Sequence, residues 1–400
     1  MDRHLLRSPG KATRVRSLDG RRGFRLAGDW GHVTVLEGGG HFCELVSKRH
    51  GSINPLWRPP WRTMDPHLYD AGRHGRIYGT PPDGRLLAGI AGHNLSFDHF
   101  GPPSQEEAAA GLSTHGEASW RRWHLRPQAA ATHPSLECSL GMTDAQIDVT
   151  RTISIEPRSP VVYIEETARS LTAFDRAISW NEHVTFGPPF LEAGVTTFDL
   201  PATFGKVCAA SYSSRMFLRP DAEFRWPLAP STRGRRIDLR KTSGDVYGRY
   251  TAQLVDPGLS LAWFAASNTK LGLMVLYMFR RADFPWIGNW EERLYRKTAP
   301  WNGKTFCRGM EFSTTPFAIP RRESVSQGAL FGEPTYRWLP ARSLQRVRYM
   351  IVLLDVANDF GGVAHVSMEK GVLRLAERGR HRRTITVRAQ NFLQMSPRKS

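Results

Sequence analysis

The sequence predicts an all-β protein built as one large antiparallel β-sandwich. Apolar or alternating segments of strand length recur after residue 145, and Pro, Gly, Asp or Asn separates most of them. The 36 Gly and 27 Pro are spread along the chain rather than clustered, which is typical of many turns between short strands. Convincing amphipathic helical patterns are few. These features favour a sandwich over a helical or mixed fold.

Nine segments carry the strand prediction after residue 145. They are 147–155, 161–168, 177–186, 247–255, 259–265, 271–279, 306–312, 350–356 and 384–387. Upstream, 32–37 and 42–46 have strand patterns, and the glycine cluster between them is a hairpin signal. Residues 105–111 predict one short helix, capped by Ser104 and ended by Gly111.

Residues 54–103 contain prolines at a density that argues against a regular helix or a central strand. A long, ordered loop is therefore expected there, with Trp57, Trp61 and Tyr78 among its aromatic side chains. Aromatic loops on a β scaffold often form binding surfaces. The alternative, that these rings simply pack beneath the loop, remains open.

The chain is expected to hold one main domain. Residues 1–28 predict a basic, poorly ordered leader or a first edge strand, residues 29–372 the sandwich, and residues 373–400 a basic C-terminal segment with room for a last strand. The net charge is +18, and residues 1–25 and 373–400 carry eight basic side chains each. Charge placed partly in the ends, without a zinc-finger, RNP or recognition-helix pattern, argues against specific nucleic-acid binding.

The sequence also indicates a compartment. The four cysteines lie far apart and form no pattern typical of a zinc site, as expected in a reducing environment. No apolar stretch of signal-peptide length is present near the N-terminus. The longest apolar run, 259–279, contains Asn268 and Lys270 and is too interrupted to span a bilayer. A soluble cytoplasmic protein without membrane contact is expected, and its oligomeric state cannot be predicted from these patterns.

Three short segments place an ionisable side chain beside small or polar neighbours where a strand should end. They are 111–117, 180–187 and 306–311, and they contain His115, His183 and Glu311. Glycine follows His115 directly and closes the second segment, and glycine allows a ligand or backbone to come close. These three segments are the candidate functional site.

The order and separation of these three segments resemble the aldose 1-epimerase family, whose fold is called galactose mutarotase-like. The likeness extends over residues 30–370 and is that of a divergent branch. It implies a two-sheet β-supersandwich with an open sugar cleft. In that family a histidine protonates the sugar ring oxygen, and a glutamate removes the proton of the anomeric hydroxyl.

By this resemblance, His183 would be the acid, Glu311 the base, and His115 would assist sugar placement or the developing charge. Opening a hemiacetal needs an acid at one oxygen and a base at another, and imidazole and a partly desolvated carboxylate suit those tasks. The chemistry requires neither a metal nor an organic cofactor. The expected ligand is a small-molecule sugar or sugar phosphate.

Four further residues are candidate sugar contacts. Asp245 falls where the family places a sugar-contacting aspartate, and Arg76, with Arg85 as an alternative, would supply the family's arginine. Trp286 could stack on the apolar face of a sugar ring or pack in the core, as could Trp290 and Trp301 near it. Glu182 either points to the face opposite its histidine neighbour or lines the cleft itself.

Two functions from different classes follow. The first is an aldose 1-epimerase-like isomerase that interconverts sugar anomers by general acid–base ring opening. The second is a non-catalytic carbohydrate-binding supersandwich, because a fold does not prove an activity and the motif around His183 lacks the family's tyrosine. An epimerase needs His183 and Glu311 to converge on one cleft, whereas a binding module needs only aromatic platforms. A third reading, a basic scaffold for nucleic acid, would need a contiguous positive stripe.

Overall fold

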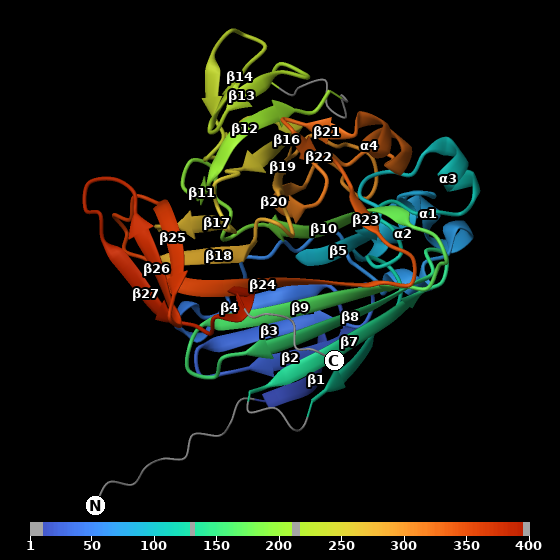
Figure 1. Cartoon of the computed structure of the whole chain (residues 1–400), viewed down its shortest axis with the longest axis horizontal. Helices are drawn as coiled ribbons and strands as arrows, with labels where there is room; N and C mark the ends of the chain where they lie inside the picture. Colours follow the sequence, from blue (N-terminus) through green and yellow to red (C-terminus); the bar gives the residue numbers. More distant parts are fainter. Residues whose placement is uncertain (1–10, 129–132, 210–216, 395–400) are drawn as a thin grey trace, which may run out of the picture.

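Two large antiparallel β-sheets form the body of the molecule in a computed structural model that describes residues 11–128, 133–209 and 217–394 (Figure 1). Within the described residues the larger sheet has 14 strands, in the order β1-β2-β3-β4-β5-β10-β20-β19-β16-β12-β13-β14-β15, with β23 paired to β10. Its strands are β1 (Lys11–Ser17), β2 (Arg21–Ala27), β3 (Gly31–Leu36), β4 (Phe42–Ser47), β5 (His93–Asp98), β10 (Arg176–Phe186), β12 (Ala202–Val207), β13 (Glu223–Arg225), β14 (Leu228–Pro230), β15 (Arg236–Asp238), β16 (Tyr247–Val255), β19 (Trp286–Arg293), β20 (Phe306–Ser313) and β23 (Arg337–Leu339).

The second sheet has eight strands in the order β11-β17-β18-β24-β9-β8-β7-β6, counted over the same residues. Its strands are β6 (His124–Pro127), β7 (Ser135–Met142), β8 (Ile147–Ile155), β9 (Val161–Ser170), β11 (Thr197–Asp199), β17 (Leu261–Asn268), β18 (Leu273–Arg280) and β24 (Leu344–Asp355). The predicted all-β class and the large antiparallel sandwich are confirmed.

Helices are short and gather at one edge of the molecule (Figure 1). They are α1 (Ala71–Tyr78), α2 (Gly84–Gly89), α3 (Gln105–Ala109) and α4 (Arg321–Gln327), with 3₁₀ turns η1 (Lys48–His50), η2 (Pro66–Leu68) and η3 (Phe392–Gln394) and a small strand pair β21 (Ala329–Leu330) and β22 (Glu333–Pro334). Across the residues described, no helix combines the length and the apolar character needed to cross a membrane. The predicted cap of α3 is confirmed, because the Ser104 side chain accepts from the Glu107 amide at 3.2 Å.

The two large sheets share one hydrophobic core, and the alternation along β10 decides which side chains enter it. Trp180, Val184 and Phe186 of β10 pack in this core against residues of the second sheet such as Ile164 and Ile351. Successive side chains of a strand point to opposite faces. The alternate residues Asn181, His183 and Thr185 therefore face the outer side of the larger sheet, and that is where the candidate site lies.

A three-stranded sheet covers the outer face of the second sheet, at the edge of the molecule opposite the helices (Figure 1). It consists of β25 (Val363–Glu369), β26 (Val372–Glu377) and β27 (Thr384–Arg388). Leu373, Leu375 and Val387 of this sheet pack against Met274 and Leu276 of β18. Both faces of β18 are therefore buried, which explains its nearly continuous apolar sequence.

Each of the nine predicted strand segments overlaps an observed strand. These strands are β8, β9, β10, β16, β17, β18, β20, β24 and β27. The prediction missed β19 (Trp286–Arg293), whose sequence mixes tryptophan, glycine and charged residues. Tertiary pairing with β16 and β20 holds this strand in a sheet that its own sequence does not indicate.

The first edge strand and the last strand that the two ends of the chain allowed are observed as β1 and β27, but the boundaries drawn at residues 28 and 373 cut through packed sheets. β1 and β2 occupy residues 11–27, inside the predicted leader. Seven residues of β1 are paired with seven residues of β2, and Phe24 and Leu26 of β2 pack in the main core. Residues 1–10 of that predicted leader lie outside the described residues. At the other end, 373–400 contributes the rest of β26 and all of β27 to a packed sheet, and its last residues, 395–400, also lie outside the described residues.

The expectation of a long loop over 54–103 was also wrong in part. This segment contains α1, α2 and the central strand β5, which pairs with both β4 and β10. Its prolines lie outside these three elements, so they interrupt the segment without preventing regular structure inside it.

Candidate functional site

His183 and Glu311 are direct partners across two neighbouring strands. β10 and β20 pair antiparallel with His183 opposite Glu311, which brings their Cβ atoms to about 5 Å. The His183 Nε2 atom lies 3.1 Å from Glu311 Oε1. Both side chains are on the outer face of the larger sheet, and each exposes less than a twentieth of its surface. The register of two strands thus creates the histidine–glutamate contact.

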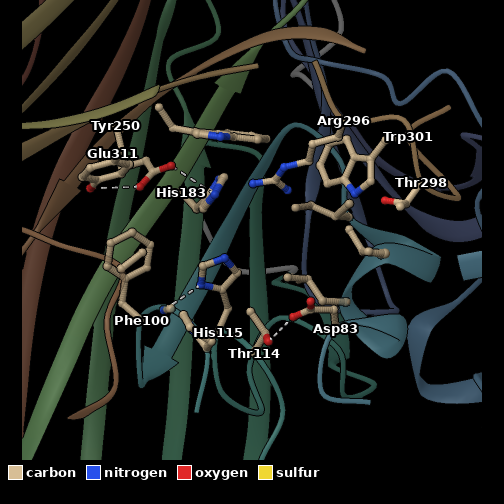
Figure 2. A pocket seen from close by; sticks show the side chains of 17 residues that line it. Asp83, Phe100, Thr114, His115, His183, Tyr250, Arg296, Thr298, Trp301 and Glu311 are labelled. Carbon is tan, nitrogen blue, oxygen red and sulfur yellow. Dashed lines mark hydrogen bonds and ion pairs between the residues drawn. The ribbon is translucent and has the colours of Figure 1, made fainter. Parts of the chain in front are cut away.

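A cavity of about 580 Å³ opens above this pair. Its wall is mainly aromatic and aliphatic, with Phe100, Tyr250, Trp290 and Trp301 as the large rings. His115 and Thr114 come from the loop before β6, and Figure 2 shows the His115 ring beside that of His183. The volume exceeds that of one pyranose ring and lies within the usual range for small-molecule sites.

The protonation of the pair follows from its burial. Burial lowers the pKa of His183 to about 4. Burial raises the pKa of Glu311 to about 8, although a hydrogen bond from the Tyr250 hydroxyl, 3.4 Å from Glu311 Oε2, opposes the change. Between these two values the pair holds one proton in total. Thr185 Oγ1, 3.1 Å from His183 Nδ1, fixes the plane of the imidazole ring.

His115 is held as a neutral hydrogen-bond donor. Its Nδ1 accepts the Gly101 amide at 3.1 Å, so a neutral ring carries its proton on Nε2. Burial lowers its pKa well below the usual histidine value, and the charges of His183, His99 and Arg296 add to that shift. The ring stacks on Phe100 at 5.3 Å and lies 5.3 Å from the His183 ring. Its backbone has a φ of 66°, in the left-handed region that residues other than glycine rarely adopt.

Two glycines inside strands make room for the reactive groups. A Cβ on Gly309 would lie 2.7 Å from Glu311 Oε1, and a Cβ on Gly288 would lie 2.0 Å from the Tyr250 hydroxyl. Both positions lie on the pocket side of the sheet beside Glu311. Glycine in a strand interior often marks such a close approach, so these residues could have pointed to the site from the sequence.

Arg296 brings the positive charge of the pocket, from the connection between β19 and β20. Its guanidinium lies 4.6 Å over the Trp301 ring, and its Nε is 3.4 Å from Glu292 Oε2. Neither Arg76 nor Arg85, the two sequence candidates for this role, lines the cavity. Arg76 is exposed on α1, and the Arg85 guanidinium lies 4.1 Å over the Trp120 ring.

The structure brings together His115, His183 and Glu311 but does not bring the other predicted contacts to them. Asp245 is exposed on the loop before β16, where it accepts from Ser243 Oγ at 2.6 Å. Trp286 is fully buried and donates from Nε1 to the Pro334 carbonyl at 2.9 Å. Glu182 points into the core between the sheets, as strand alternation demands.

The aromatic loop residues pack rather than line the cavity. Trp57 stacks on Trp301 at 6.3 Å, and Trp61 meets the same ring edge-on at 5.1 Å. They hold Trp301 in place. Trp301 and Trp290 both line the cavity. Of the residues that the sequence left open, Trp290 and Trp301 therefore belong to the pocket.

Sequence reasoning did not find Tyr250 or Arg296. Tyr250 lies in a strand whose residues are buried on both faces, so alternation gives no contrast there. Arg296 is one of many arginines in an irregular segment, and no local pattern distinguishes it. Among the described residues, no group of three or more His, Cys, Asp or Glu side chains is placed to hold a metal ion.

The fold is similar to that of solved structures from several bacteria. A candidate aldose 1-epimerase from Klebsiella pneumoniae superimposes with a TM-score of 0.63 and 13% identity over 88% of this chain and 85% of its own. A galactose mutarotase-like protein from Clostridium acetobutylicum gives 0.58 and 11% over 87% and 99%. A candidate aldose 1-epimerase from Escherichia coli K12 gives 0.56 and 10% over 86% and 100%.

These likenesses confirm the resemblance at the level of the fold. The chain has the galactose mutarotase-like β-sandwich, and its low identity to these proteins fits a divergent branch. No protein-family profile matches the chain, and no curated protein matches it. Identity this low shows the fold alone, so the activity must be argued from the site.

Proposed function

We propose that the protein is an aldose 1-epimerase-like isomerase that interconverts the anomers of a sugar. One observation carries this proposal: His183 and Glu311 converge at 3.1 Å on the floor of one cavity. A binding module would not need an acid and a base in contact. The convergence is therefore the feature that favours an enzyme over a non-catalytic carbohydrate-binding domain.

The reaction needs one proton on the pair and returns it unchanged. With the pKa of Glu311 at about 8 and that of His183 at about 4, the resting proton lies on Glu311, and the direct contact lets it pass to His183. His183 then protonates the ring oxygen while Glu311 takes the proton of the anomeric hydroxyl. The bond between C1 and the ring oxygen breaks, and an open-chain aldehyde forms.

Ring closure reverses these transfers on either face of the aldehyde. After rotation about the C1–C2 bond, His183 takes back the proton of the ring hydroxyl, and Glu311 returns its proton to the carbonyl oxygen. The neutral His115 donor would stabilise the charge that develops on the sugar oxygens. The aromatic wall, with Trp290 among its rings, would pack against the apolar face of the sugar.

The test is NMR exchange spectroscopy of anomeric interconversion, with wild type compared to His183→Gln and Glu311→Gln. Acceleration by the wild type is expected, with a loss of about 10²- to 10⁴-fold in each variant, because each removes one general acid–base group. His365→Gln and Glu369→Gln on the exposed side of β25 are matched controls that should keep full activity. Acceleration that persists in both pocket variants contradicts the proposal. Binding without acceleration supports a carbohydrate-binding module instead.

A further inference from the structure

Arg296 is a charged group of the pocket that the acid–base chemistry leaves without a role. Of the side chains that line the cavity within the described part of the chain, it is the only lysine or arginine. Figure 2 shows its guanidinium extending from the Trp301 side of the cavity toward the imidazoles of His183 and His115. A cation thus stands beside the acid of the proposed reaction.

The guanidinium is held in place by Glu292, outside the cavity lining, and by Trp301 of the cavity wall. The Glu292 carboxylate accepts the backbone amides of Tyr295 and Arg296 at 2.9 Å each through Oε1, and its Oε2 lies 3.4 Å from Arg296 Nε. Glu292 is buried and therefore fixed in turn. Stacking on Trp301 adds a cation–π contact at 4.6 Å. Such anchoring orients the donors before a ligand binds, which reduces the entropy lost on binding.

At the reacting end of the cavity, Arg296 is the cationic side chain that faces a ligand, and its partner Glu292 lies outside the cavity lining. Burial lowers the pKa of His183 and of His115, so both rings are neutral. Burial also raises the pKa of Glu311 to about 8, so this carboxyl group is protonated at neutral pH. The other acidic side chain of the cavity, Asp83, accepts the Thr114 hydroxyl at 2.5 Å, and Figure 2 shows it away from His183 and Glu311. Arg296 is thus the charge that a ligand meets next to the pair.

The covalent structure of a pyranose says which substituent this charge would meet. The ring oxygen joins C1 to C5, and C5 carries the exocyclic C6. A sugar whose ring oxygen contacts His183 and whose anomeric hydroxyl contacts Glu311 has C6 on the remaining side of the ring oxygen. A cation beside His183 therefore lies next to the C6 substituent.

We propose that the substrate is a hexuronic acid, whose C6 carboxylate binds Arg296 while His183 and Glu311 act on the ring oxygen and the anomeric hydroxyl. This assignment rests on the proposed function and names its substrate class. The planar fork of arginine matches a carboxylate with two parallel hydrogen bonds. A 6-phosphate carries almost two negative charges, and the cavity offers it one cation and the acidic Asp83.

The first experiment compares the wild type on five sugars: glucuronate, galacturonate, glucose, galactose and glucose 6-phosphate. The readout is kcat/KM for anomer exchange, measured by NMR at low and at moderate ionic strength. The uronates should exceed their neutral counterparts by about 10-fold or more, which is the effect of one charge-assisted bond pair. That preference should shrink as salt rises, because ions screen the attraction.

The second experiment follows the ratio of glucuronate to glucose in Arg296→Gln and Arg296→Lys. The glutamine variant should lower this ratio by about 10- to 100-fold, and the lysine variant should retain part of it, because lysine keeps the charge but not the fork. Lys297→Gln is the control, since it removes an equal charge from the next residue, which is exposed. The control should leave the ratio unchanged.

The outcomes separate this inference from the proposed function. Equal rates for uronates and neutral sugars, a preference for glucose 6-phosphate, or an unchanged ratio in Arg296→Gln overturns the uronate assignment while the epimerase stands. Acceleration of no sugar at all overturns the epimerase. In that case glucuronate binding decides the role of Arg296, and equal calorimetric affinity in wild type and Arg296→Gln overturns it too.

Discussion

Two histidine–glutamate pairs occupy opposite faces of the same strand, and only one of them opens on a cavity. His183 and Glu311 meet at 3.1 Å on the outer face of β10. One residue earlier, Glu182 meets His93 at 2.8 Å on the inner face, between the two sheets. Residue types and distances are nearly the same, so the difference lies in what surrounds each pair.

The inner pair belongs to a closed polar network. The carboxylate of Glu182 accepts hydrogen bonds from the Tyr349 hydroxyl at 3.1 Å and from Trp180 Nε1 at 3.3 Å. Arg151 lies 3.8 Å from Glu182 and 2.5 Å from a second buried glutamate, Glu166. These groups expose almost no surface. The inner pair therefore stabilises one arrangement of the core and has no route to a ligand.

A histidine–glutamate contact acquires chemistry from access and from having a hydroxyl rather than a buried guanidinium against its carboxylate. The outer pair has a cavity above it, and the group that contacts Glu311 on its other side is the neutral Tyr250 hydroxyl. The outer pair can thus exchange its proton with a ligand, whereas the carboxylate of the inner pair is held in the buried ion pair with Arg151. Four predictions test this contrast.

The largest expected effect is on the inner side. Arg151→Met should lower the free energy of unfolding by about 3–5 kcal/mol, because it leaves Glu166 and Glu182 buried without their cation. Denaturant unfolding followed by fluorescence measures this change. Arg126→Met is the control, since Arg126 makes an exposed ion pair with Glu137, and it should lose at most about 1 kcal/mol. Equal losses in the two variants would mean that the inner network is not what holds the sheets together.

The second effect is on the pH dependence of stability. Because the pKa of Glu311 is raised to about 8 in the folded protein, its stabilising contribution is complete below the unfolded value near 4.5 and is lost as the pH rises toward 8. The wild type should therefore lose stability relative to Glu311→Gln by about 1.4 kcal/mol per pH unit over that window. Urea titrations at several pH values measure the difference, and a pH-independent gap between the two proteins would refute it.

The third effect concerns the space beside Glu311. Gly309→Ala would place a methyl group 2.7 Å from Glu311 Oε1 and 3.3 Å from the Trp290 side chain, so the carboxylate must move. Anomer exchange should fall by about 100-fold, as expected when a reacting group is displaced by about 1 Å. Gly141→Ala on β7 meets only an ordinary contact at 3.5 Å and should keep its activity. If both variants are fully active, the carboxylate does not need its observed position.

The smallest effect is on the orientation of His183. Thr185→Val removes the hydroxyl that lies 3.1 Å from Nδ1 but keeps the shape of the side chain. The rate should fall by about 2- to 10-fold, which corresponds to one neutral hydrogen bond. Single-turnover NMR measures this change. A larger loss, accompanied by a change in unfolding free energy, would point to a structural role for the threonine instead.

The fold could be predicted because strand patterns are local, and the central pair because the order of three segments resembles that of a known family. Strand-length segments with alternating or apolar residues identified β8, β10, β16 and β20. Alternation left two positions open for Glu182, the cleft and the opposite face, and the structure places it on the opposite face, in the core. The resemblance in the order of three segments identified His115, His183 and Glu311, which the register of β10 and β20 brings together.

The rest of the pocket depends on long-range packing that no local pattern encodes. Arg296 reaches the cavity because Glu292 and Trp301 hold an irregular connection against the sheet. Asp245 and Arg76 carry suitable chemistry in the sequence, yet their loop and helix leave them in solvent. Proline density over 54–103 does not reveal the helices in 71–89, because the prolines lie between the elements and not within them.

The strand order of the larger sheet also has a consequence for folding kinetics. β10 lies between β5 and β20 in the larger sheet. Four strands of the second sheet, β6 to β9, separate β5 from β10 in the sequence, and three more, β11, β17 and β18, separate β10 from β20. Contacts so distant in sequence form slowly, because their chain loops must close before the contacts can stabilise them. Refolding should therefore restore β-structure first and anomer exchange last, so that no partly folded species carries the activity.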